Sequence, residues 1–139
     1  MIYLGSDHAG YELKLFIMKH LQDKNVPFTD GGSQNGETCD YPDVAHSVCN
    51  RLKDGDLAIL ICGTGVGMSI AANKIHGIRA AGVSDIYSAK MARLHNNANV
   101  LCLGGRVIGS GLATEIVDTF LSTNFEGGRH TARLAKIES

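Results

Sequence analysis

Short apolar runs alternate with segments of helical periodicity along the whole chain, and this alternation limits the possible folds more than any other feature. Residues 2–5 form an apolar run that predicts a first strand, and the apolar spacing that follows predicts a helix over about residues 10–24. Strands that alternate with helices form parallel sheets, because the helix returns the chain to the same edge of the sheet. The sequence therefore predicts an α/β fold with a parallel sheet.

The same alternation continues to the C-terminus. Further strands are expected at residues 26–29, 57–62, 79–83 and 99–103. Further helices are expected from about residue 41 through Leu52, from the end of the glycine-rich loop 63–67 through Asn73, from Ser84 as N-cap, and over about 109–122, with a short helix in the tail 125–139. Residues 57–62 are apolar throughout, which is typical of a central strand covered on both faces. No linker or repeat interrupts the pattern, so residues 1–139 are expected to form one domain.

The charge balance excludes several classes of partner. Lys and Arg total 13, Asp and Glu total 14, and the net charge is -1. Proteins that bind nucleic acid usually carry a basic face, and this chain scatters its cations, so we expect neither a nucleic-acid nor a membrane partner. The N-terminus lacks the pattern of a secretory signal, and no apolar run approaches the roughly 20 residues that span a bilayer. We expect a cytoplasmic protein.

The four cysteines and six histidines show no metal or disulfide pattern. There is no C-x-x-C or H-E-x-x-H segment and no Cys/His pair at zinc-ligand spacing. We therefore expect neither a disulfide framework nor a metal, and no other cofactor.

Ligands of open parallel sheets bind beyond the carboxyl ends of the strands, so the segments that follow the strands are the first candidates for a site. These segments are SDHAG at 6–10, CGTGVG at 62–67 and GGR at 104–106. The middle one opens a helix, so its backbone N–H groups predict an anion or oxyanion site. It lacks the Gly-Lys-Ser/Thr ending of a Walker A loop, and its G-x-G-x-G spacing after the third strand differs from the dinucleotide-binding G-x-G-x-x-G pattern after a first strand. A turn that only packs a helix on the sheet is the alternative.

Each candidate side chain also has a purely structural interpretation. Cys62 is either a buried core thiol or a thiolate stabilised by the neighbouring loop amides. Asp7 is either a helix cap or a ligand, and His8 either a surface or a ligand histidine. His95 lies between a helix and the fifth strand, at the amino edge of the sheet, so it either caps that helix or acts in the site of a neighbouring subunit. Arg129 and Arg133, four residues apart, either grip a phosphate or form a solvated basic face.

Taken together, these segments resemble the ribose-5-phosphate isomerase B and galactose-6-phosphate isomerase family. The matching segments are GSDHAG at 5–10, DYP at 40–42, ICGTGVGMSIAANK at 61–74, GIRA at 77–80, HN at 95–96, NV at 99–100, GR at 105–106, and EGGRH at 126–130 with Arg133. They extend over nearly the whole chain. The resemblance implies a Rossmann-like three-layer α/β/α sandwich, here with five parallel strands, that binds no nucleotide.

The resemblance also implies roles for individual residues. The base that removes the proton beside the carbonyl falls on Cys62, and the residue that helps to open the furanose ring falls on His95, assisted by Thr64. Residues implied to bind the sugar, its carbonyl oxygen or its phosphate are Asp7, His8, Tyr41, Gly63, Gly65, Val66, Gly67, Asn96, Arg106, Arg129 and Arg133. In this family the site lies between two subunits, which implies a homodimer or a dimer of dimers with residues 125–139 reaching the interface.

The expected activity is the interconversion of ribose 5-phosphate and ribulose 5-phosphate through a cis-enediolate. In the galactose-6-phosphate enzymes the site is divided between two different chains, each of which lacks part of the set. This chain keeps Cys62, the His95-Asn96 pair and the Gly-Gly-Arg-His segment, so it resembles the self-sufficient ribose-5-phosphate type. The alternatives are an isomerase of allose 6-phosphate or galactose 6-phosphate, and a module that binds a sugar phosphate or nucleotide without catalysis.

Overall fold

The computed structural model describes residues 1–139 and contains one parallel sheet of five strands in the order β2-β1-β3-β5-β4. The strands are β1 (Ile2–Ser6), β2 (Thr29–Asp30), β3 (Leu57–Cys62), β4 (Ala80–Gly82) and β5 (Val100–Gly104). The helices are α1 (Tyr11–Asp23), α2 (Tyr41–Cys49), α3 (Val66–Ala72), α4 (Ile86–Leu94), α5 (Ser110–Ser122) and α6 (Arg129–Glu138). The predicted α/β fold with five parallel strands is confirmed.

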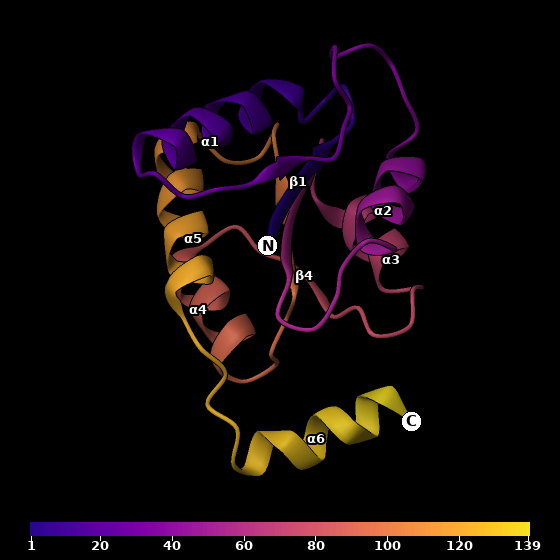
Figure 1. The fold of residues 1–139 in the computed structure, drawn as a ribbon, viewed down its shortest axis with the longest axis vertical. Coiled ribbons are helices and arrows are strands. Elements are labelled where there is room, and N and C mark those ends of the chain that lie inside the picture. The colour runs from indigo at the N-terminus through magenta and orange to yellow at the C-terminus, as the bar shows by residue number, and fades with distance from the viewer.

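Helices cover both faces of the sheet, which makes the domain a three-layer sandwich. Helices α1, α4 and α5 lie on one face, and α2 and α3 lie on the other (Figure 1). Each face has its own apolar core, and the side chains of β3 and β5 alternate between the two. This double coverage explains why β5 is fully buried and β3 is buried except at Leu57.

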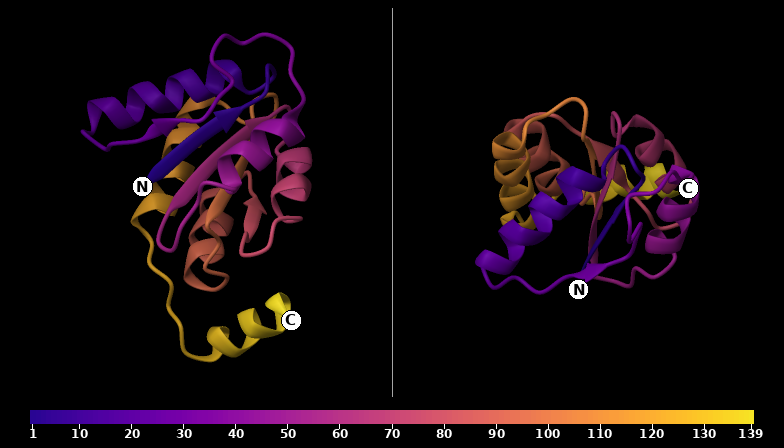
Figure 2. Two further views of the ribbon diagram at one scale, coloured as in Figure 1. Left: turned by 45° about the vertical axis from the view of Figure 1, so that its right-hand side comes forward. Right: turned by 90° about the horizontal axis from the view of Figure 1, so that it is seen from above.

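Helix α6 stands apart from the sandwich. It lies beyond the amino ends of the strands, connected to α5 by an extended segment (Figures 1 and 2). Its last turn is attached to the start of β4, where Arg79 Nη1 lies 2.7 Å from Glu138 Oε1. The carboxyl ends of the strands, where the predicted ligand loops begin, lie at the other end of the domain.

The second strand is shorter and later than its sequence pattern predicts. Only Thr29 and Asp30 pair with β1, whereas the expectation was residues 26–29. Val26 and Phe28 are half-buried and pack against the core from an irregular segment, so their apolar character reflects packing and not strand pairing.

Two helix ends also differ from expectation. Asp85, not Ser84, caps α4: its extended backbone lets Oδ1 accept the Ser88 N–H at 2.7 Å. Hydrogen bonds from the backbone and side chain of Ser88 lower the pKa of the Asp85 carboxyl. Helix α2 ends at Cys49, and Leu52 packs against the core from the turn that follows.

Lys14 on α1 is fully buried, which is rare for a lysine. Its ammonium lies 2.7 Å from Asp30 Oδ1 and also donates to the Ser33 carbonyl. It thereby ties α1 to the end of β2 and to the loop that leads toward Tyr41.

We predict that Lys14→Met lowers the free energy of unfolding by about 2–4 kcal/mol, because it leaves the Asp30 carboxylate and the Ser33 carbonyl without their donor. Urea denaturation measures the change. Lys19→Met is the matched control, since the Lys19 side chain is 71% exposed in its ion pair with Asp23; we expect a change within about 0.5 kcal/mol. Equal losses in the two variants would contradict the anchoring role of Lys14.

Candidate active site

The loops that follow β1, β3 and β5 are hydrogen-bonded to one another at the carboxyl edge of the sheet. The Asp7 N–H donates to the Ile61 carbonyl at 3.2 Å. On the other side of β3, the Gly105 N–H donates to the Cys62 carbonyl at 2.8 Å and the Arg106 N–H to the Gly63 carbonyl at 3.0 Å. The predicted ligand loops therefore form one continuous surface.

Cys62 is the last residue of β3 and lies where the glycine loop begins. Its side chain is nearly buried, and Sγ accepts the Gly65 N–H at 3.1 Å. A donated N–H stabilises the negative charge that a thiolate carries. Gly65 has a φ of +83°, a backbone conformation that side-chain-bearing residues rarely adopt, and this conformation turns the loop back toward the sulfur.

Two other buried cysteines, Cys49 and Cys102, share the apolar core of Cys62. Burial raises the pKa of Cys49 to about 11, and it raises the pKa of Cys102 as well. Both therefore stay protonated thiols at neutral pH and belong to the core between the sheet and helices α2 and α3.

Within the glycine loop, part of the hydrogen-bonding capacity is used internally. The Val66 N–H donates to Thr64 Oγ1 at 3.2 Å, just as the Gly65 N–H donates to Cys62. The sequence-based expectation of a row of exposed N–H groups therefore needs a correction: these two amides have partners before any ligand arrives.

Polar and aromatic side chains from three other segments surround this loop. Asp7 is buried and accepts the Gly10 N–H through Oδ1 at 3.1 Å, at the entrance to α1. His8 is exposed, and its Nδ1 accepts the Cys39 N–H at 3.4 Å. The Tyr41 ring lies so close to Gly67 that a Cβ there would be 2.6 Å from Cζ.

Arg106 completes this surface from the loop after β5. A Cβ on Gly63 would lie 3.7 Å from Arg106 Nη1, which places the guanidinium beside the start of the glycine loop. The structure thus brings ten predicted site residues together at the carboxyl edge: Asp7, His8, Tyr41, Cys62, Gly63, Thr64, Gly65, Val66, Gly67 and Arg106.

The other four predicted residues lie at the opposite edge of the sheet. His95 is the C-cap of α4, where its N–H donates to the Met91 carbonyl at 2.8 Å, and Asn96 follows it. Arg129 and Arg133 are exposed on α6. The position of His95 at the amino edge agrees with the expectation. Helix α6 and the end of α4, which carry these four residues, lie at the opposite end of the sheet from the end of β3 (Figure 1).

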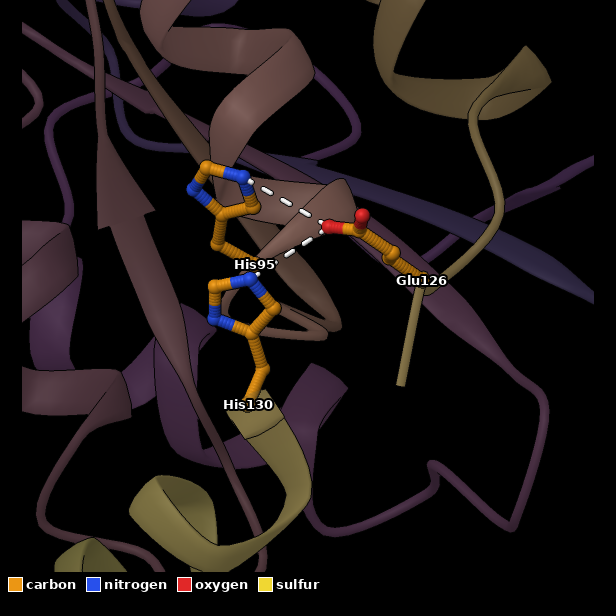
Figure 3. A group of neighbouring side chains, drawn as sticks. All are labelled: His95, Glu126 and His130. Atoms are coloured by element: carbon orange, nitrogen blue, oxygen red, sulfur yellow. Dashed lines mark ion pairs between the residues drawn. The ribbon is translucent and has the colours of Figure 1, made fainter. Parts of the chain in front are cut away.

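His95 belongs to a compact group with Glu126 and His130, shown in Figure 3. The two imidazole rings stack with centroids 4.3 Å apart and planes inclined by 15°. Glu126 Oε2 lies 3.3 Å from His130 Nε2 and 3.7 Å from His95 Nε2. Burial lowers the pKa of His130; His95, Arg129 and Arg133 lower it further, and only the Glu126 carboxylate opposes them.

The geometry of this group does not suit a shared metal ion. A metal binds an imidazole nitrogen in the plane of the ring, and two nearly parallel rings have their lone pairs in separate planes. The two histidines therefore do not converge on one point, although their nitrogen atoms are close.

Two neighbouring cavities lie at the amino edge of the sheet, away from Cys62. One of about 650 Å³ is lined by residues that include Arg79, Asn96 and Ile137, and one of about 510 Å³ lies next to it. No helix is long and apolar enough to cross a membrane.

Sequence reasoning missed the contribution of Glu126 and the burial of His130. Both residues stand in the quoted EGGRH segment, and their spacing of four residues was the available signal for contact. The stack on His95 had no such signal, because it joins residues 35 positions apart across the connection after α5.

The chain matches the family described as Ribose/Galactose Isomerase over residues 2–137. It is 48% identical over 139 residues to the protein named ribose-5-P isomerase B from Listeria innocua, covering 99% of this chain and 94% of that one. A solved ribose-5-phosphate isomerase B from Clostridium thermocellum superimposes with a TM-score of 0.95 at 50% identity, covering 99% of this chain and 94% of that one.

A second solved structure carries a ligand. It is ribose-5-phosphate isomerase B from Mycoplasma genitalium with bound ribulose-5-phosphate, with a TM-score of 0.94, 48% identity, and coverage of 99% of this chain and 93% of that one. Identity at this level over nearly full length, with the same fold, leaves one family for the chain. It belongs to the ribose/galactose isomerase family.

Proposed function

We propose that the protein is an aldose-ketose isomerase that interconverts ribose 5-phosphate and ribulose 5-phosphate. The observation that carries the proposal is the position of Cys62 at the end of β3, where its sulfur accepts a hydrogen bond from the Gly65 N–H. The chain is also similar, over nearly its whole length, to proteins named ribose-5-phosphate isomerase B. The complex of the Mycoplasma genitalium relative with ribulose-5-phosphate supports a pentose phosphate as ligand.

The proposed reaction moves one proton between two carbons. Once the furanose is open, the Cys62 thiolate removes the proton from C2, and the electron pair of that C–H bond forms the C1–C2 double bond of a cis-enediolate. A proton then passes from O2 to O1, and Cys62 returns its proton to C1, which leaves the ketone at C2. The negative charge that develops on oxygen is stabilised by those N–H groups of residues 63–67 that have no partner inside the loop, which excludes the amides of Gly65 and Val66, with no metal required.

The remaining predicted residues bind and prepare the substrate. His95, assisted by Thr64, opens the furanose ring, and Asp7, His8, Tyr41 and Asn96 bind hydroxyl or carbonyl oxygens. Arg106, Arg129 and Arg133 hold the phosphate, which fixes the sugar relative to the thiolate.

We propose that two copies of the chain complete one site, as a homodimer or a dimer of dimers. The ten residues lie at the carboxyl ends of the strands, whereas the other four follow α4 or lie on α6, at the opposite edge of the sheet, so one chain presents the two sets at different ends. Apolar side chains are exposed on the helices that come before and after the edge strand β4, and a partner subunit could bury them. Val66 is 60% and Ile70 58% exposed on α3, and Tyr87 is 73% exposed on α4. Ribose 5-phosphate as the proposed substrate agrees with the expectation that the protein is cytoplasmic.

The test compares ribose 5-phosphate, allose 6-phosphate and galactose 6-phosphate as substrates of the purified protein, each with and without a chelator. We expect the highest kcat/KM for ribose 5-phosphate and no effect of the chelator. A preference for allose 6-phosphate or galactose 6-phosphate would contradict the proposal and identify an isomerase of a six-carbon sugar phosphate. Binding of a sugar phosphate without turnover would instead identify a non-catalytic module.

A further inference from the structure

Glu126 is fixed in place beside the end of α4. Its N–H donates to the Leu94 carbonyl at 3.0 Å, and Leu94 directly precedes His95. The two residues therefore keep a constant relation to each other, although they lie on different segments.

The Glu126 carboxylate determines which nitrogen of each neighbouring ring carries the proton. Oε2 lies 3.3 Å from His130 Nε2 and 3.7 Å from His95 Nε2, as Figure 3 shows. A nitrogen lone pair that faces a carboxylate oxygen at this distance is repelled, whereas an N–H is attracted. His130 Nε2 is buried and has no hydrogen-bond partner, so this carboxylate is its polar neighbour. Both rings therefore carry hydrogen on Nε2, and Nδ1 keeps the lone pair.

His130 gives this arrangement a rigid support. Its ring is only 5% exposed and stacks on His95 at 4.3 Å. Burial also lowers the pKa of His130, which favours the neutral form of the ring that stacks on His95.

We propose that Glu126 is a positioning residue for His95: together with the stacked His130 ring it holds the Nε2 edge of His95 and leaves Nδ1 as the atom that exchanges a proton with the sugar. This inference rests on the proposed function, because it assigns an atom to the ring-opening step. In that step the anomeric hydroxyl gives its proton to Nδ1, its O–H electron pair forms the carbonyl at C1, the bond from C1 to the ring oxygen breaks, and the ring oxygen takes up a proton from water.

The experiment compares the full-length protein with its Glu126→Ala and Glu126→Asp variants. Histidine-selective ¹⁵N NMR of the substrate-free protein reports which ring nitrogen of His95 and His130 is protonated, and ribose 5-phosphate kinetics report kcat and KM. Glu115→Ala is the matched control, since Glu115 is exposed on α5. Glu126→Gln replaces the alanine variant should that one fail to fold.

We expect both histidines to be protonated on Nε2 in the parent and His95 to shift to a mixture of tautomers in Glu126→Ala. We expect kcat to fall about 10- to 100-fold, as for other residues that orient a reacting imidazole, with KM near the parent value. Glu126→Asp should recover part of the parental kcat and part of the Nε2-protonated form of His95. Glu115→Ala should change neither kcat nor the His95 tautomer.

An unchanged His95 tautomer in Glu126→Ala would overturn the inference, even if kcat fell, because a general structural role would then account for the loss. An unchanged kcat would overturn it as well. Failure of the proposed function is distinct: the parent would then convert no sugar phosphate, while the NMR comparison would still decide whether Glu126 sets the tautomers.

Discussion

Cys62→Ala is expected to lower kcat on ribose 5-phosphate by about 100-fold or more, the usual contribution of a positioned base. The variant loses the sulfur that accepts the Gly65 N–H at the end of β3, and no other titratable group on the glycine loop can remove the C2 proton. Coupled spectrophotometric assay of ribulose 5-phosphate formation measures the loss, and exchange of the C2 hydrogen with deuterated water measures the proton-abstraction step by itself.

The control separates catalysis from packing. Cys49→Ala removes a buried thiol whose raised pKa keeps it protonated, in the same apolar core as Cys62 but on α2. We expect Cys49→Ala to lose some stability and to keep its kcat. Near-parental conversion by a folded Cys62→Ala variant would refute the assignment of the base.

The fold was predictable because its signals are local. Residues 57–62 and 100–103 are continuous apolar runs, and they lie in β3 and β5, the two most buried strands. The errors occur where tertiary packing replaces local pattern: Val26 and Phe28 are apolar because they cover the core, and pairing with β1 starts only at Thr29.

The site was predictable to the extent that it follows the strand ends. Asp7 follows β1, Cys62 ends β3 and Arg106 lies two residues beyond β5, so topology alone brings them to one edge. The position of His95 at the other edge follows from the same rule. What the sequence could not give are contacts between distant segments that leave no periodic trace, such as the stack of His95 on His130 or the buried pair of Lys14 with Asp30.

The second large effect concerns the division of the site between copies. His95→Ala is expected to lower kcat by about 100-fold, since it removes the group that opens the ring. In a dimer with two equivalent sites, a Cys62→Ala chain and a His95→Ala chain together form one site with both residues intact and one site with neither.

Mixing the two inactive variants therefore tests the central claim, that one site takes Cys62 from one copy and His95 from the other. After equal amounts of the two variants are unfolded together and refolded, random pairing makes half of the dimers mixed, and half of their sites are intact. The account predicts recovery to about one quarter of the parental activity. Activity that stays at the level of the separate variants, with mixed dimers demonstrated by differently tagged chains, would contradict it and place the whole site within a single chain.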